Sequence, residues 1–136
     1  MNNTELRLHD VFFYGLYMDP KILMSKNVEP RNPRMGYANG YKLRVGNMAT
    51  LLRQEDTKTY GLVYSLAYEE VDFLYTKSGL DMYISEALLV TLESGGSIPA
   101  LCYNLLIPPA DSESNSEYES KLTECMGRLN IPILND

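Results

Sequence analysis

The chain has 136 residues, which is enough for a single domain that buries roughly two thirds of the surface exposed by its unfolded form. Its 12 Lys and Arg residues and 18 Asp and Glu residues give a formal charge of −6, and the basic residues form no patch, so nucleic acid is a poor candidate partner. No apolar run is long enough to span a membrane, and Cys102 and Cys125 lack the spacing of metal ligands. We therefore expect one domain over residues 1–136 in the cytoplasm, with free thiols, no metal or cofactor, and no membrane or nucleic-acid partner.

The first predicted elements are a strand and a short helix separated by one glycine. The apolar run from Val11 to Tyr14 predicts a buried strand, and Asp19-Pro20 supplies an N-cap and a first residue for a helix that ends near Ser25. The amides of the turn at Gly15 and the free N–H groups of the helix start are expected to point at one spot, where the helix dipole adds positive charge. Such a spot suits a carboxylate or a developing oxyanion.

Further strands and helices follow along the chain. Strands are predicted over residues 35–45 and 59–66, with the apolar segment 47–53 and a polar turn at 54–58 between them. Val71, Leu74 and Tyr75 follow a helical period, and this short helix is expected to end near Ser78-Gly79. Strands over 82–92 and 98–106 and a helix over 118–129 complete the pattern. We predict an α+β domain with about six strands, in a small mixed or antiparallel sheet that curls into a barrel with short helices at its rim.

Four local patterns together span most of the chain, and the order in which they occur is similar to that of a known protein family. They are the strand and turn at residues 12–18, the glycine-containing segment at 40–64, the helix and strand at 74–83, and the closing helix at 118–132. In this order they resemble the γ-glutamylcyclotransferase-like family of small barrel proteins. The resemblance implies that a γ-glutamyl compound lies against the turn after the first strand, with Tyr14, Gly15, Leu16, Tyr17, Tyr83 and Tyr118 as its substrate-binding residues.

The resemblance also implies a reaction for the active members of the family. A glutamate late in the short helix takes a proton from the γ-glutamyl α-amine, which attacks its own γ-carbonyl, closes 5-oxoproline and releases the amine partner. This chemistry needs a carboxylate base, an oxyanion site and a wall that holds the two ends of the glutamyl chain together.

This sequence departs from the family at the position of the catalytic glutamate. Alignment with the family's Leu-Asp-x-x-Glu-Gly assigns Ser78 to the position of the acid, and a serine hydroxyl cannot act as a carboxylate base near pH 7. Asp81 is the nearest candidate substitute. Glu86, within an apolar strand, either faces solvent on the barrel exterior or is an interior acid with a raised pKa. Leu16 and Tyr17 also replace small and polar residues of the family's turn, although backbone donors depend little on side-chain identity.

These observations leave two functions open. The first is a binding module that kept the pocket and lost the acid, and that binds a small carboxylate-bearing ligand of the γ-glutamyl type at the Tyr14–Gly15 turn. The alternative is an active γ-glutamyl cyclotransferase or lyase that releases 5-oxoproline with Asp81 or Glu86 as its base. From local sequence alone the tyrosines are equally typical of ordinary packing, and a barrel mouth closed by Tyr17 would leave a structural or partner-binding protein. The sequence carries no signal for an oligomeric state.

Overall fold

The computed structural model describes residues 7–133, and the ends of the predicted domain, residues 1–6 and 134–136, lie outside the described part. Within it, five strands form a closed barrel in the order β1-β3-β2-β4-β5. The strands are β1 (Leu8–Phe13), β2 (Arg31–Val45), β3 (Ala49–Ala67), β4 (Tyr83–Leu92) and β5 (Ser97–Leu105). Neighbouring strands are antiparallel except β1 and β5, whose parallel pairing closes the barrel. The predicted α+β barrel is confirmed.

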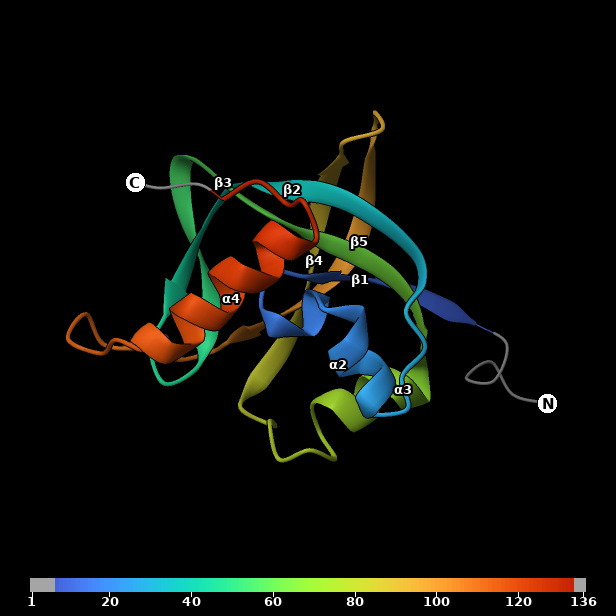
Figure 1. Cartoon of the computed structure of the whole chain (residues 1–136), viewed down its shortest axis with the longest axis horizontal. Helices are drawn as coiled ribbons and strands as arrows, with labels where there is room; N and C mark the ends of the chain where they lie inside the picture. Colours follow the sequence, from blue (N-terminus) through green and yellow to red (C-terminus); the bar gives the residue numbers. More distant parts are fainter. Residues whose placement is uncertain (1–6, 134–136) are drawn as a thin grey trace.

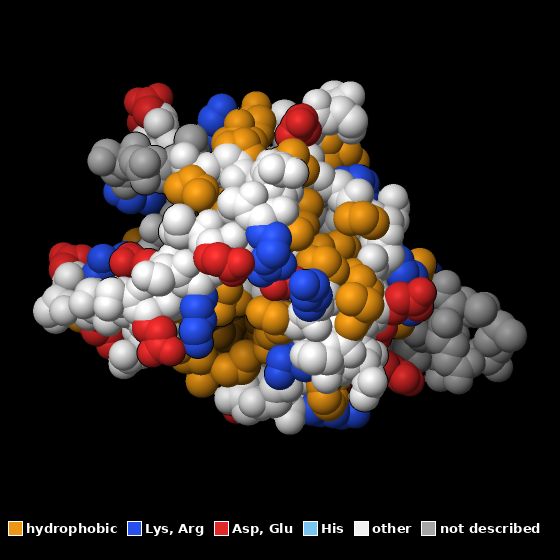
Figure 2. Space-filling view, in the orientation of Figure 1, with side chains coloured by type: hydrophobic (Ala, Val, Ile, Leu, Met, Phe, Trp, Pro, Cys, Tyr) orange, Lys and Arg blue, Asp and Glu red, His pale blue; other side chains and the backbone are white. Residues whose placement is uncertain are grey.

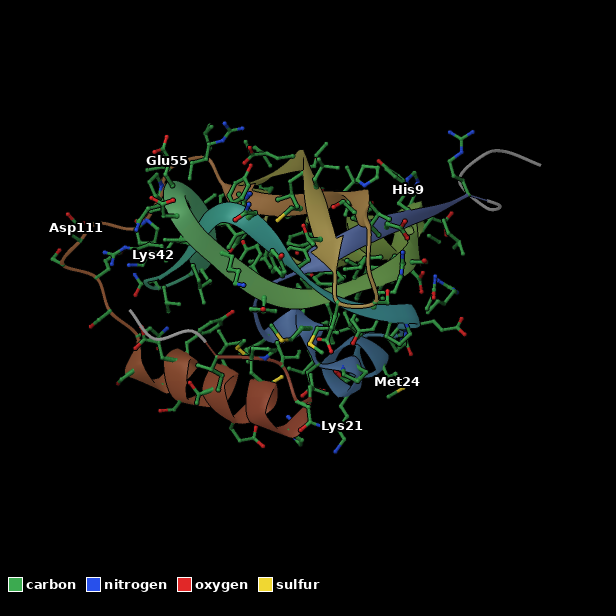
Figure 3. All side chains as sticks on the ribbon, turned by 90° about the horizontal axis from the view of Figure 1, so that it is seen from above. His9, Lys21, Met24, Lys42, Glu55 and Asp111 are labelled. Atoms are coloured by element: carbon green, nitrogen blue, oxygen red, sulfur yellow. The ribbon has the colours of Figure 1, made fainter. Side chains whose placement is uncertain are left out.

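Short helices lie against this barrel. They are the 3₁₀ helix η1 (Leu16–Met18), α2 (Pro20–Ser25), α3 (Tyr68–Leu74) and α4 (Ser116–Arg128). In Figure 1, α2 and α4 lie in front of the strands, and the perpendicular view in Figure 3 shows both on that same side of the barrel. Within the described residues, no helix is long and apolar enough to cross a membrane.

The strand count is five rather than about six because one segment is longer than predicted. The segments on either side of the polar turn at residues 54–58 both belong to β3, and both pair with β2. Asn39 lies opposite Lys58 and Tyr41 lies opposite Arg53, so the residues between Arg53 and Lys58 bulge out of the ladder. Gly40, at φ +83°, gives β2 the left-handed conformation at this irregularity. Our prediction mistook a polar bulge for a turn between two strands.

Both faces of β1 are buried over its second half, residues 11–13, which explains the continuous apolar run there. Val11 and Phe13 belong to a core that includes residues of α2, α3 and α4, whereas Phe12 belongs to a second core inside the barrel. Phe12 lies opposite Val63 in the pairing with β3. A strand held on both faces is a rigid support, so the Tyr14–Gly15 turn leaves the barrel at a fixed position.

Candidate functional site

A cavity of about 380 Å³ opens where β1 ends. Its wall includes all the residues that the resemblance assigned to substrate binding, namely Tyr14, Gly15, Leu16, Tyr17, Tyr83 and Tyr118. Further wall residues come from β1, α2, the turn between β2 and β3, and the α3–β4 connection, namely Phe13, Ile22, Lys26, Asn47, Met48, Ala49, Tyr75 and Leu80. Figure 2 shows a hollow on this side of the molecule, walled by hydrophobic side chains and bordered by Lys or Arg side chains. The predicted binding residues therefore lie around one space.

The turn contributes backbone donors to this space, with one of them already engaged. The Leu16 amide donates to the Tyr118 hydroxyl (3.2 Å). The amides of Gly15 and Tyr17 donate in no hydrogen bond within residues 7–133. Two amides of the predicted set are therefore unpaired within residues 7–133, in residues that line the cavity.

The start of α2 does not add donors, contrary to our prediction. The Asp19 carboxylate accepts a hydrogen bond from the Lys21 amide (2.9 Å) and another from Arg128 Nη2 (2.9 Å). Burial alone would raise the pKa of Asp19, but these two partners hold it below its usual value. The anion that the helix start attracts is the protein's own carboxylate, which caps α2 and fixes it to α4.

Gly15 is needed for a close approach rather than for an unusual backbone conformation. A Cβ atom at this position would collide with the Tyr118 hydroxyl oxygen. Because that hydroxyl is the acceptor for the Leu16 amide, a glycine here lets the start of α4 close over the turn. Gly15 and Tyr118 therefore act together in shaping the cavity wall.

Three tyrosine hydroxyls in the wall are engaged with backbone carbonyls. Tyr14 donates to the Tyr103 carbonyl (2.6 Å), Tyr83 donates to the Ala49 carbonyl (2.6 Å), and Tyr17 donates to the Leu74 carbonyl (3.2 Å). Burial raises the pKa of each of these phenols, so each stays protonated near neutral pH. These contacts tie the wall together and leave its rings facing the space.

Tyr75 is the wall residue that sequence reasoning missed as a site residue. Its side chain is only 9% exposed, it stacks on Tyr103 with 4.1 Å between ring centroids, and its hydroxyl has no hydrogen-bond partner among the described residues. No described side-chain oxygen or nitrogen is both fully buried and unpaired, so this hydroxyl keeps some exposed surface, and Tyr75 lines the cavity. Burial raises its pKa well above the usual value, which keeps it a neutral donor. Its helical spacing with Val71 and Leu74 had indicated burial, without distinguishing core from cavity.

Ser78, which the alignment assigned to the position of the family's acid, lies outside the cavity wall. It is exposed in the turn after α3, and its hydroxyl donates to the Phe73 carbonyl (2.5 Å). The reason is that α3 ends at Leu74, earlier than predicted, with Tyr75 as its C-cap. The residue that the end of α3 presents to the cavity is therefore Tyr75.

The two candidate substitute acids also lie away from the cavity. Asp81 is exposed just before β4 and does not line the space. Glu86 is exposed on β4, where its carboxylate accepts a hydrogen bond from Asn104 Nδ2 (3.2 Å). Neither carboxylate is within the set of side chains that a ligand in the cavity would touch.

Lys26 is the charged side chain in the cavity wall. It is half-buried at the end of α2 and forms no ion pair within residues 7–133. No Asp or Glu side chain is part of the wall, and the described residues contain no group of three or more His, Cys, Asp or Glu side chains that could hold a metal. The cavity thus combines one positive charge with aromatic rings and hydrogen-bond donors.

Comparison with known proteins supports the fold. No protein-family model and no curated protein sequence matches the chain. Among solved structures, a γ-glutamyl cyclotransferase matches with a TM-score of 0.78 at 15% identity, over 93% of this chain and 83% of the other. An uncharacterised protein from Homo sapiens matches with a TM-score of 0.76 at 17% identity, over 93% and 83% of the two chains. An AIG2-like protein from Mus musculus matches with a TM-score of 0.59 at 20% identity, over 85% and 94%. The resemblance inferred from the four sequence patterns is thereby confirmed at the level of fold: this chain has the γ-glutamylcyclotransferase-like fold.

Proposed function

We propose that this protein binds a small carboxylate-bearing ligand of the γ-glutamyl type in the cavity at the Tyr14–Gly15 turn, without the cyclisation reaction of the active cyclotransferases that it resembles. The composition of the cavity wall carries this proposal. Lys26 and the unpaired amides of Gly15 and Tyr17 border the space, and no carboxylate side chain does. A positive charge and N–H donors favour a bound carboxylate. A general base for cyclisation has to be an acceptor within hydrogen-bond reach of the amine, and the wall lacks a carboxylate that could fill this role.

The alternative, an active enzyme that uses Asp81 or Glu86, has less support. Both side chains are exposed and neither lines the cavity. The resemblance implies that active members present their glutamate from the end of the short helix, and here that end carries Tyr75. Because burial raises the pKa of Tyr75, its phenol is a poor base near neutral pH.

Calorimetric titration with a panel of γ-glutamyl amines and dipeptides, combined with an assay for 5-oxoproline on the same mixtures, tests the proposal. We expect members of the panel to bind and no 5-oxoproline to form above the uncatalysed background. Absence of binding across the whole panel would remove the binding function. Steady release of 5-oxoproline by the unmodified protein would favour the alternative enzyme instead.

A pair of variants tests the assignment of the α3 end. Tyr75→Glu adds a carboxylate to the cavity wall, and Ser78→Glu adds the same charge at an exposed position outside it. A positioned general base contributes about 10²–10⁴-fold to a rate, so Tyr75→Glu should produce measurable 5-oxoproline while Ser78→Glu stays at background. Activity in Ser78→Glu alone would show that the base position lies at Ser78 and that our reading of the helix end is incorrect.

A further inference from the structure

Several polar groups in the cavity wall are donors without a partner among the described residues. The amides of Gly15 and Tyr17 and the hydroxyl of Tyr75 have no hydrogen-bond partner within residues 7–133. The Tyr118 hydroxyl accepts from the Leu16 amide, which leaves its own proton to donate. A ligand that satisfies these groups has to bring acceptor oxygens.

The charged side chain that lines the cavity is positive. Lys26 lines the space without an ion-pair partner among the described residues, and none of the wall side chains is Asp or Glu. Asp19, the carboxylate that follows the turn, is already engaged by Arg128 and by the Lys21 amide. An ammonium group bound here would lose hydration, would be repelled by Lys26 and would gain no ionic partner.

The body of the cavity is aromatic. The Tyr17 ring lies 6.1 Å from that of Phe13 and 5.8 Å from that of Tyr75, and the Tyr75 ring lies 5.6 Å from that of Tyr83. These four rings form a continuous apolar wall next to the free donors. Such a wall favours a ligand that carries an apolar or aromatic group besides its acceptor oxygens.

From these three observations we infer that the ligand of this cavity is a carboxylate whose amino group is absent or blocked, attached to an apolar or aromatic body. The inference rests on the proposed binding function and adds a preference to it: γ-glutamyl compounds with a free amine bind, and their deaminated or N-blocked counterparts bind more tightly. Lys26 supplies the charge for the carboxylate, the amides of Gly15 and Tyr17 and the free hydroxyls of Tyr75 and Tyr118 supply donors, and the four rings cover the apolar body.

A matched set of ligands tests the inference on the unmodified protein. N-benzylglutaramate and γ-glutamylbenzylamide differ only in the α-ammonium group, and N-benzylbutanamide lacks both the ammonium and the carboxylate. Because an unpaired ammonium is costly to desolvate and a carboxylate is attracted by Lys26, calorimetry should give N-benzylglutaramate at least about tenfold tighter binding than either of the others. Equal or tighter binding of γ-glutamylbenzylamide would overturn the inference and leave the proposed function in place. Absence of binding by all three compounds would overturn both.

Two variants test the role of the lysine, with a control on the same helix. Lys26→Gln should weaken binding of N-benzylglutaramate by about tenfold through loss of the charge, with little effect on N-benzylbutanamide. Lys21→Gln makes the same change in net charge at an exposed residue of α2, which points away from the barrel in Figure 3, and should leave the affinity unchanged. An equal loss in both variants would mean that general electrostatic attraction, rather than a lysine in the cavity, holds the carboxylate, and would overturn the assignment.

Discussion

Removal of the Tyr75 hydroxyl should leave the stability of the free protein almost unchanged, whereas removal of the Tyr64 hydroxyl should not. Tyr64 is 1% exposed and its hydroxyl donates to the Met18 carbonyl (2.7 Å), so Tyr64→Phe deprives a buried carbonyl of its donor. The expected cost is about 1–3 kcal/mol. Tyr75 is 9% exposed and stacked on Tyr103, yet its hydroxyl has no partner among the described residues, so Tyr75→Phe should change stability by less than about 0.5 kcal/mol.

Thermal unfolding followed by circular dichroism separates the two variants. A chain of this length loses about 0.3 kcal/mol of stability per degree near its midpoint, which predicts a fall in Tm of about 3–10 °C for Tyr64→Phe and under about 2 °C for Tyr75→Phe. Both substitutions keep the aromatic ring, so packing is matched. A fall for Tyr75→Phe as large as that for Tyr64→Phe would refute the reasoning, since it would mean that the Tyr75 hydroxyl is already paired in the free protein and is not a donor kept for a ligand.

Three further predictions concern the Gly15–Tyr118 contact, the cap of α2 and the carboxylate–arginine pairs. Gly15→Ala should displace the Tyr118 hydroxyl from the Leu16 amide; the amide resonance of residue 16 should shift in the NMR spectrum, and an unmoved resonance would contradict the predicted collision. Asp19→Ala removes the cap of α2 and the partner of an arginine, so urea unfolding should show a loss of about 1–2 kcal/mol, whereas a neutral effect would mean that α2 needs no cap. Asp10, Asp19 and Glu70 each bond to an arginine, namely Arg34, Arg128 and Arg31, and these bonds hold the folded-state pKa of each carboxyl below its unfolded value. The stability that these pairs contribute should be fully present above about pH 5 and should be lost as the pH falls through the folded-state pKa values. A Tm independent of pH between about 5 and 2 would contradict this.

Features with a local cause could be predicted from the sequence. The apolar run of β1 and the Asp19-Pro20 helix start depend on residues within a few positions of one another, and both elements appear in the structure, with β1 beginning at Leu8 rather than at Val11. The bulge in β3 was missed because polar, turn-forming residues are equally typical of a bulge, and pairing with β2 decides between the two. The end of α3 was missed for a similar reason, since nothing in the local sequence stops the helical pattern at Leu74.

The sequence allowed prediction only of those site residues that the order of the family patterns or the chemistry of neighbouring residues indicates. Tyr83 and Tyr118 were assigned to the cavity by the order of the patterns, and both lie in its wall. The bond between the Leu16 amide and Tyr118 joins residues 102 positions apart, and that between Arg128 and Asp19 joins residues 109 apart. Contacts over such separations depend on how the barrel and helices pack, which composition and spacing do not reveal. The same packing places Tyr75, which its helical spacing indicated to be buried, in the cavity wall.

The most direct test of the account is a ¹H–¹⁵N NMR titration of the unmodified protein with N-benzylglutaramate. The amide resonances of Gly15 and Tyr17 should shift in a saturable manner at one common affinity, because these are the unpaired donors beside the cavity. The amide of Lys21, which is bound to Asp19, should move little. Saturable shifts confined to another surface, or an unchanged spectrum at millimolar ligand, would contradict the claim that this cavity receives a carboxylate.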